Sequence, residues 1–210
     1  MKTTLLLLRH GATASNLAKP AKLQGLNHNP PLDGIGVRQA TVTRDYLAIE
    51  TIHACYTSPL QRAIQTAAII AEPHNLKPVP LEALIECNVG DWEGKSWEEI
   101  RETEPDAYHA FMRNPAKNGY GGGENFAEVY DRVSVAINEL FDKHPGLCIL
   151  VVAHHVVNRT YLASTIGLPI SQARRISLEN CGISIVVRED NKMTVKTLNS
   201  AFHLRGVTVP

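Results

Sequence analysis

The sequence predicts an α/β fold in which helices cover both faces of a central sheet. Two short apolar runs, 5–8 and 149–153, have the length and composition of buried strands. Around them, further strand patterns alternate with stretches of helical periodicity, an order that is typical of α/β proteins. The chain has 210 residues and shows no internal repeat or linker composition, so a single domain over 1–210 is expected.

The first part of the chain begins with a strand over 3–9 and a polar loop over 12–33. Pro30-Pro31 and Asp33-Gly34 mark the loop as irregular, and a loop of this length in a compact domain is usually functional. Ser58 and Pro59 suit the N-cap and the first position of a helix. The remaining elements expected here are a helix over 36–48, a strand over 52–56, a helix over 60–71 and a short strand over 79–81.

Residues 92–123 predict a small, cap-like helical insertion over the edge of the sheet. Two short polar helices are expected over 96–103 and 105–113, the first with a capping box formed by Ser96 and Glu99. The last part of the chain predicts a long amphipathic helix and a second buried strand, then a helix ended by Gly167 and a terminal hairpin. These elements are expected over 124–143, 147–153, 156–166, and 183–188 with 193–198.

Composition excludes several classes of protein. Lys and Arg together number 21, as do Asp and Glu, so the chain lacks the basic excess of a nucleic-acid binder and any anion site must be local. The apolar runs are too short for a signal peptide or a membrane span, and no membrane partner is expected. Four cysteines without paired spacing argue against a disulfide scaffold or a zinc site and are typical of a reduced, cytoplasmic protein. The sequence leaves the oligomeric state open, including a homodimer formed through a sheet edge.

Charged and imidazole side chains follow three of the predicted strands. One strand ends in Arg9 and His10, a second runs into His154, and a third leads to Arg62 near the start of a helix. The ends of parallel strands meet at one edge of a sheet, where α/β proteins bind ligands. Two histidines and two arginines would then converge, which predicts an anion site that holds a nucleophile. Taken alone, Arg9-His10 is equally compatible with a solvated strand end.

This set of side chains suits phosphoryl transfer. Guanidinium groups bind phosphate oxygens in pairs and stabilise their charge, and a neutral imidazole nitrogen can attack phosphorus. The leaving alkoxide needs a proton, for which Glu86 is the candidate and Glu82 the competitor. This chemistry requires no metal or other cofactor, and the sequence has no aspartate cluster suited to magnesium.

Several motifs occur in the same order as in a known family. They are Arg9-His10-Gly11, 58–67, 86–94 and Val152-Ala153-His154, supported by Gln24-Gly25, Pro31-Leu32, Gln39-Ala40 and Gly122-Gly123-Glu124. The triplet Arg-His-Gly alone is a weak signal, but the ordered set covers most of the chain. It resembles the histidine phosphatase superfamily, in its phosphoglycerate-mutase-like branch.

The resemblance implies a three-layer α/β/α sandwich with a mainly parallel sheet, and a phosphohistidine intermediate on His10. It further implies that Arg9, Arg62 and His154 hold the phosphate and that Glu86 donates the proton. Asn16 matches a position that contacts phosphate in many members. The other candidate substrate-binding residues are Gln24, Gly25 and His155.

The sequence departs from the commonest family pattern in three places. Ala12 stands where Glu or Gln is frequent, and His155 stands where Gly usually follows the second histidine. The segment 85–90 resembles phosphatases rather than true mutases, and the chain is shorter than typical mutases. We therefore predict a phosphomonoesterase acting on a small phosphorylated metabolite. A cofactor-dependent phosphoglycerate mutase and a non-catalytic phospho-ligand-binding protein are the alternatives. Specificity is expected from 12–28 and 92–123.

Overall fold

A six-stranded mixed sheet forms the centre of the molecule, with the strand order β3-β2-β4-β1-β5-β6. The computed structural model describes residues 1–207. The strands are β1 (Thr3–Arg9), β2 (Ala54–Thr57), β3 (Val79–Pro80), β4 (Cys148–Ala153), β5 (Ile183–Glu189) and β6 (Lys192–Ser200). Strands β1 to β4 run parallel, whereas β5 pairs antiparallel with β1 and forms a hairpin with β6. The predicted, mainly parallel sheet is therefore extended on one side by the predicted terminal hairpin.

The two apolar strands β1 and β4 lie side by side, and their register aligns their carboxyl ends. Leu8 pairs with Val152 and Arg9 with Ala153. The backbone N–H of His10 then donates to the carbonyl oxygen of Ala153 over 3.0 Å. Both strands are covered on both faces, which is why their sequences are continuously apolar rather than alternating.

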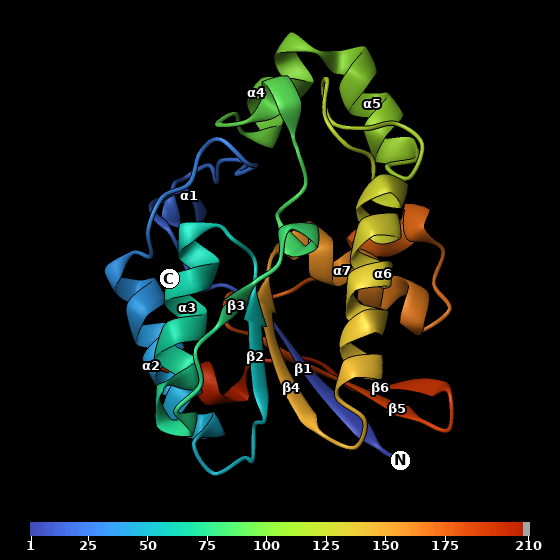
Figure 1. Cartoon of the computed structure of the whole chain (residues 1–210). Helices are drawn as coiled ribbons and strands as arrows, with labels where there is room; N and C mark the ends of the chain where they lie inside the picture. The colour runs from blue at the N-terminus through green and yellow to red at the C-terminus, as the bar shows by residue number, and fades with distance from the viewer. Residues whose placement is uncertain (208–210) are drawn as a thin grey trace.

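Helices cover both faces of the sheet, which confirms the three-layer α/β/α architecture (Figure 1). One face carries α2 (Gly34–Leu47) and α3 (Gln61–Ala71), and the other carries α6 (Phe126–Lys143) and α7 (His155–Thr165). The side chains of β1 alternate between two separate cores. Leu6 and Leu8 share a core with residues of α3, whereas Leu5 and Leu7 share one with residues of α6.

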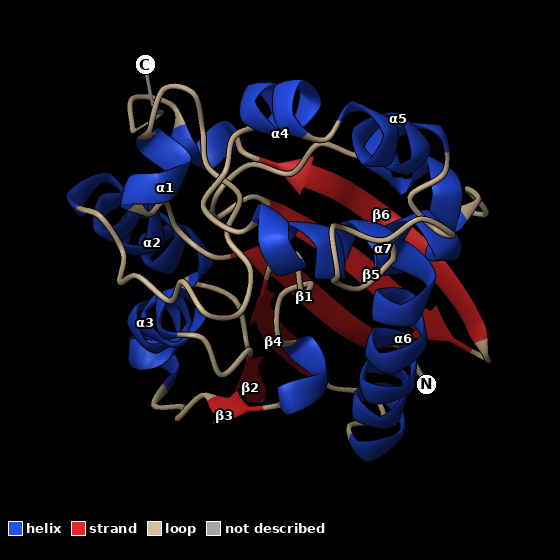
Figure 2. Ribbon diagram, turned by 90° about the horizontal axis from the view of Figure 1, so that it is seen from above, coloured by secondary structure: helices blue, strands red, loops and turns tan. Residues whose placement is uncertain are grey.

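The insertion stands above the carboxyl ends of the strands (Figures 1 and 2). Its helices are α4 (Trp97–Thr103) and α5 (Pro105–Arg113), and α4 begins with the predicted capping box. Trp92 is completely buried and packs against the rings of Phe111 and Tyr120. Short 3₁₀ helices are η1 (Glu72–His74), η2 (Glu82–Leu84), η3 (Gly90–Trp92), η4 (Ile170–Arg175) and η5 (Phe202–Leu204).

Two local predictions differ from the structure. The polar loop after β1 contains a short helix, α1 (Ala14–Leu17), which the loop composition did not indicate. Ser58 is not the N-cap of α3, because that helix begins at Gln61 after Leu60. The Ser58 hydroxyl accepts from the N–H of Leu60 over 3.2 Å and contacts His154, so it fixes the turn before the helix.

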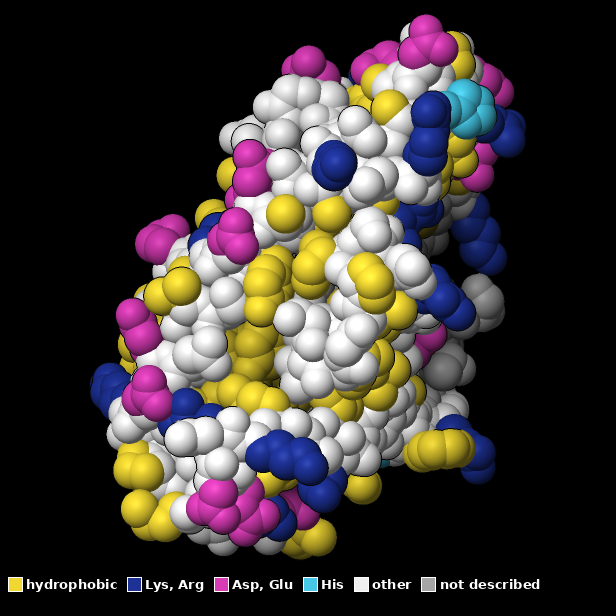
Figure 3. Space-filling model, turned by 90° about the vertical axis from the view of Figure 1, so that its right-hand side faces the viewer, with side chains coloured by type: hydrophobic (Ala, Val, Ile, Leu, Met, Phe, Trp, Pro, Cys, Tyr) yellow, Lys and Arg dark blue, Asp and Glu magenta, His cyan; other side chains and the backbone are white. Residues whose placement is uncertain are grey.

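The surface reflects the balance between positive and negative residues. Side chains of both signs are scattered over the face shown in Figure 3, around a hollow in which hydrophobic side chains are visible. Within residues 1–207, the helices are too short or too polar to cross a membrane.

Candidate active site

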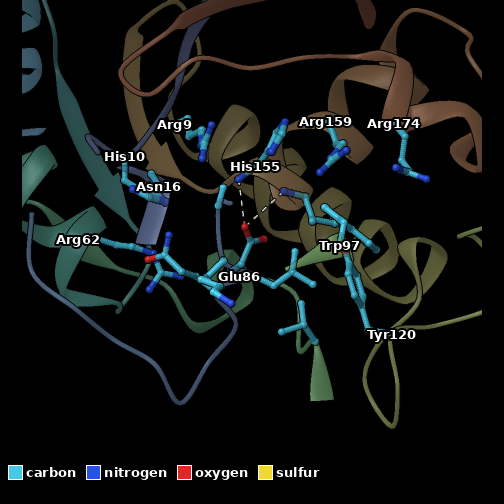
Figure 4. Close-up of a pocket in the computed structure, with 16 residues that line it drawn as sticks. Arg9, His10, Asn16, Arg62, Glu86, Trp97, Tyr120, His155, Arg159 and Arg174 are labelled. Atoms are coloured by element: carbon cyan, nitrogen blue, oxygen red, sulfur yellow. Dashed lines mark hydrogen bonds between the residues drawn. The ribbon is translucent and has the colours of Figure 1, made fainter. Parts of the chain in front are cut away.

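A cavity of about 330 Å³ opens at the carboxyl ends of β1 and β4, below the insertion (Figure 4). Most of the residues predicted for the site line it, namely Arg9, His10, Asn16, Gln24, Arg62, Glu86 and His155. They come from the end of β1, the loop that follows, the first turn of α3, the segment after η2, and the start of α7. The structure therefore brings together side chains that lie up to 146 residues apart in the sequence, from Arg9 to His155.

His10 has the protonation state of a nucleophile. Its side chain is buried, and Nδ1 lies 2.7 Å from the carbonyl oxygen of Gly11. A carbonyl oxygen only accepts hydrogen bonds, so this contact assigns the proton to Nδ1 and leaves the lone pair on Nε2. Burial, assisted by the charges of Arg62 and Arg9, holds the pKa of His10 well below its usual 6.5. The imidazole is therefore neutral at pH 7.

Arg9 and Arg62 form an unpaired cationic clamp. Arg9 donates from Nη1 to the carbonyl of Leu178 over 2.7 Å, and Arg62 donates to the carbonyls of His28 and Gly25 over 3.3 and 3.2 Å. The Nε atoms of both side chains are buried without a partner, and neither arginine pairs with an acid within residues 1–207. Burial lowers the pKa of Arg9 to about 10, so it remains charged at pH 7. Buried, unpaired cations at a cavity indicate an anionic occupant.

His154 lies against His10 at the point where α7 begins. It is the N-cap residue of α7 and is completely buried, and the two imidazole centroids are 5.1 Å apart. Its Nε2 is 2.7 Å from the hydroxyl of Ser58, whereas Nδ1 has no partner. Burial, with Arg62 next, lowers the pKa of His154 well below 6.5. When Ser58 donates to Nε2, Nδ1 carries the proton and is available to an anion beside His10.

Glu86, rather than its competitor Glu82, faces the cavity. Its Oε1 accepts from the N–H of Cys87 over 2.9 Å, and its Oε2 accepts from the N–H of His155 over 3.1 Å (Figure 4). The second contact places the carboxyl group at the N-terminus of α7, where the helix dipole attracts negative charge. Glu82 is exposed on η2 and lines a different cavity.

A brace from α6 holds the segment that carries Glu86. Arg132 donates to the carbonyls of Ala83 and Ile85 over 2.7 and 2.8 Å. Its guanidinium also pairs with Glu124 over 2.9 Å, and Glu124 accepts from the N–H of Asn88 over 2.7 Å. The backbone on both sides of Glu86 is therefore fixed to one ion pair.

The loop residues differ in how they meet the cavity. Asn16 and Gln24 line it. The side-chain oxygen of Gln24 accepts from the hydroxyl of Thr13 over 2.9 Å, and that of Asn16 accepts from the backbone N–H of Thr13 over 3.1 Å. Gly25 is buried and does not line the cavity. Its N–H donates to Glu93 over 3.0 Å and its carbonyl accepts from Arg62, so Gly25 holds the Arg62 guanidinium, and its predicted role in substrate binding stays a prediction.

Four further side chains line the cavity, namely Trp97, Tyr120, Arg159 and Arg174. Trp97 and Tyr120 belong to the segment 92–123, from which specificity was expected, whereas sequence reasoning missed Arg159 and Arg174. Arg159 could have been found, because it lies four residues after His155 on the helix that begins at His154, and such residues share one helix face. Arg174 comes from η4, whose sequence carries no comparable signal. Asn180 also supports the site, since its side-chain amide donates to the carbonyl of His10 over 2.8 Å.

The fold and the cavity together define a class of protein: an enzyme that acts on a phosphorylated small molecule. A family model described as the histidine phosphatase superfamily (branch 1) matches residues 5–201. The chain belongs to the histidine phosphatase superfamily, as its motifs predicted.

Relatives and solved structures agree with this membership. The chain is 31% identical to phosphoserine phosphatase 1 of Hydrogenobacter thermophilus over 200 residues, which cover 95% of this chain and 93% of the relative. It is 34% identical to the metal-independent phosphoserine phosphatase of Arabidopsis thaliana over 209 residues, covering 98% and 84%. YhfR of Bacillus stearothermophilus has a similar structure, with a TM-score of 0.89 at 30% identity and coverage of 96% and 99%. The prediction of a phosphatase acting on a small phosphorylated metabolite is confirmed at this level.

Proposed function

We propose that the protein hydrolyses a small phosphate monoester in two steps, with the phosphoryl group carried on Nε2 of His10. The observation that carries this proposal is the buried His10 imidazole, bonded through Nδ1 to Gly11 and set beside two unpaired guanidiniums. In the first step the Nε2 lone pair forms a bond to phosphorus. The bond from phosphorus to the alcohol oxygen breaks, and its electron pair leaves with that oxygen.

Glu86 and the arginines supply the rest of the chemistry. The carboxyl proton of Glu86 passes to the departing oxygen, and the alcohol leaves. In the second step a water gives a proton back to Glu86 and its oxygen bonds to phosphorus, while the bond to His10 breaks and inorganic phosphate is released. Arg9 and Arg62, with Asn16 and Nδ1 of His154, bind the phosphoryl oxygens, whose charge must be stabilised throughout.

The proposal extends to the substrate and the compartment. Two relatives are named as phosphoserine phosphatases, and phosphoserine is of a size that a cavity of about 330 Å³ accommodates. A cytoplasmic location is supported by four unpaired cysteines. Burial raises the pKa of Cys55 and Cys181 to about 12, which keeps both as unreactive thiols.

The test is phosphate release from p-nitrophenyl phosphate by the wild type and by His10→Ala. We expect the variant to lose several orders of magnitude in turnover, because no other group occupies the position of Nε2. The wild type should also form a phosphoenzyme that is stable in base and labile in acid, as expected of phosphohistidine. His109→Ala, an exposed substitution on α5, is the matched control. Wild-type turnover by His10→Ala contradicts the mechanism. Isomerisation of a phosphoglycerate without phosphate release identifies a mutase instead.

A further inference from the structure

The cavity has a second cationic end that the proposed phosphoryl transfer does not use. Arg159, from α7, and Arg174, from η4, line it together with His10 and Arg62. In Figure 4 the two guanidiniums lie across Glu86 from His10 and Arg62. A phosphoryl group held at His10 leaves this end to another part of the substrate.

Arg159 lacks the partners that a partly buried arginine normally has. Within residues 1–207 it forms no ion pair, and its Nε is buried without a hydrogen-bond acceptor. Burial lowers the pKa of Arg159. The negative charge of Glu86 offsets part of this effect, and the positive charge of Arg174 lowers the pKa further. Two guanidiniums that repel each other and form no ion pair with an acid are costly to hold together, unless an anion completes the arrangement.

Aromatic rings fix the orientation of both guanidiniums. The Cζ of Arg159 lies 5.4 Å from the ring centroid of Phe126, and that of Arg174 lies 5.4 Å from the ring centroid of Trp97. A guanidinium held against a ring face still presents its N–H groups at its edge, in the plane that suits a carboxylate. Trp97 of the insertion and Phe126 of α6 thus hold cations as well as packing the fold.

The charges around the cavity indicate how many anionic groups it accepts. Among the described lining residues, Glu86 is the sole acid, and the arginines are Arg9, Arg62, Arg159 and Arg174. Lys22 also lines the cavity but pairs with Glu99 over 2.7 Å. The two negative charges of a phosphate dianion balance the positive charges of Arg9 and Arg62. With Glu86 protonated for the first step, Arg159 and Arg174 remain without a counter-charge.

We propose that the substrate carries a carboxylate in addition to its phosphate, and that Arg159 and Arg174 bind this carboxylate. The inference rests on the proposed function, because it takes the phosphate to lie at His10. The substrate class is then the phosphate ester of a small hydroxy acid or hydroxy amino acid. A carboxylate fits better than a second phosphate, because it is planar and adds only one charge to a small cavity.

Two matched pairs of substrates test the proposal. O-phosphoserine differs from O-phosphoethanolamine by the carboxylate alone, and 3-phosphoglycerate differs from glycerol 3-phosphate by a carboxylate in place of a hydroxymethyl group. We expect the wild type to favour the carboxylate member of each pair in kcat/KM by about 10- to 100-fold, the range for hydrogen bonds to a charged group. Arg159→Met and Arg174→Met should reduce this preference, because kcat/KM falls more for the carboxylate member than for the other. Arg175→Met, an exposed neighbour bonded to Gln172, should preserve it.

The outcomes separate the inference from the proposed function. Equal kcat/KM within both pairs, or equal losses on both members in Arg159→Met, overturns the carboxylate site. A preference for fructose 1,6-bisphosphate over fructose 6-phosphate, without a preference for the carboxylate substrates, also overturns the carboxylate site. Calorimetric binding of phosphoserine and phosphoethanolamine to His10→Ala tests the same site without turnover. If the wild type hydrolyses none of these esters, the proposed function fails, while the binding preference still decides the inference. Arg159→Lys, which keeps the charge, should retain part of the preference and shows that Arg159→Met acts through charge.

Discussion

At the scale of single residues, the site separates two acid–base roles by their surroundings. His10 is buried and lies near the positive charges of Arg62 and Arg9. Both effects keep its imidazole unprotonated. Glu86 instead lies at the start of a helix, within reach of backbone N–H groups and on the cavity wall. The two groups to which we assign the nucleophile and the acid therefore lie in one small cavity with different neighbours.

The role of Glu86 predicts a dependence on the leaving group. In Glu86→Gln we expect turnover of alkyl phosphates to fall about 10²- to 10⁴-fold, the usual contribution of a general acid. Turnover of p-nitrophenyl phosphate should fall much less, since nitrophenolate leaves without a proton. Steady-state kinetics on both esters measure the difference. Glu82→Gln should behave as the wild type, because that side chain is exposed on η2. Equal slowing of both esters would show that Glu86 is not the acid.

At the scale of elements, the brace between α6 and the segment around Glu86 links stability to catalysis. In Arg132→Met, the carbonyls of Ala83 and Ile85 and the carboxylate of Glu124 lose their shared donor. We expect the free energy of unfolding to fall by about 1–3 kcal/mol. We also expect a weaker form of the leaving-group dependence of Glu86→Gln, because the acid is then less well positioned.

Chemical denaturation and the same two esters measure these effects. Arg188→Met removes the ion pair with the largely exposed Asp142 and serves as the control. A loss of stability in Arg132→Met with unchanged relative rates on the two esters would confine the brace to a structural role.

Most elements could be predicted from the sequence because their signals are local. The helix α5 was predicted at its observed bounds, since Pro105 and the apolar spacing define it without reference to the rest of the chain. The role of Ser58 before α3 was predicted wrongly, because its hydroxyl contacts His154, a residue 96 positions away. The helix α1 was missed for a similar reason. Its Asn16 is held through contacts with Thr13 and Asn180, and the latter belongs to the opposite end of the chain.

At the scale of the whole molecule, the buried His10 and His154 and the half-buried His155 make stability depend on pH. Burial holds the pKa values of His10, His154 and His155 well below 6.5. Below about pH 6.5 the unfolded chain takes up protons at these positions and the folded chain does not, so the free energy of unfolding falls as the pH falls. Each histidine contributes at most about 1.4 kcal/mol per pH unit, and the three together about 4.

Denaturation at pH 7.5, 6.5 and 5.5 measures this slope. His155→Gln should reduce it, because it removes one of the groups that take up a proton on unfolding. His109→Gln, exposed on α5, should leave it unchanged. A free energy of unfolding that stays constant from pH 7.5 to 5.5 would contradict the prediction.

The topology and packing of the whole molecule explain which site residues could be predicted from the sequence. His10, Arg62 and His154 follow strands that run parallel, so their meeting depends on the topology of an α/β sheet and could be inferred from pattern. Arg159 and Arg174 meet only because η4 packs beside α7, and this contact depends on tertiary packing. The residues at the end of the cavity that we assign to the phosphate could therefore be predicted to meet, and those at the end that we assign to a carboxylate could not.

The register of β1 has a consequence for sequence variation. Leucines occupy both faces of this strand, Leu5 and Leu7 on one side and Leu6 and Leu8 on the other. Exchanging one leucine for another apolar residue alters packing slightly and leaves His10 in place. Deleting one leucine would still bury an apolar side chain on each face, yet it would turn His10 to the opposite side of the sheet from its present neighbours. This strand therefore tolerates the exchange of one apolar residue for another, but it does not tolerate a change in the number of its residues.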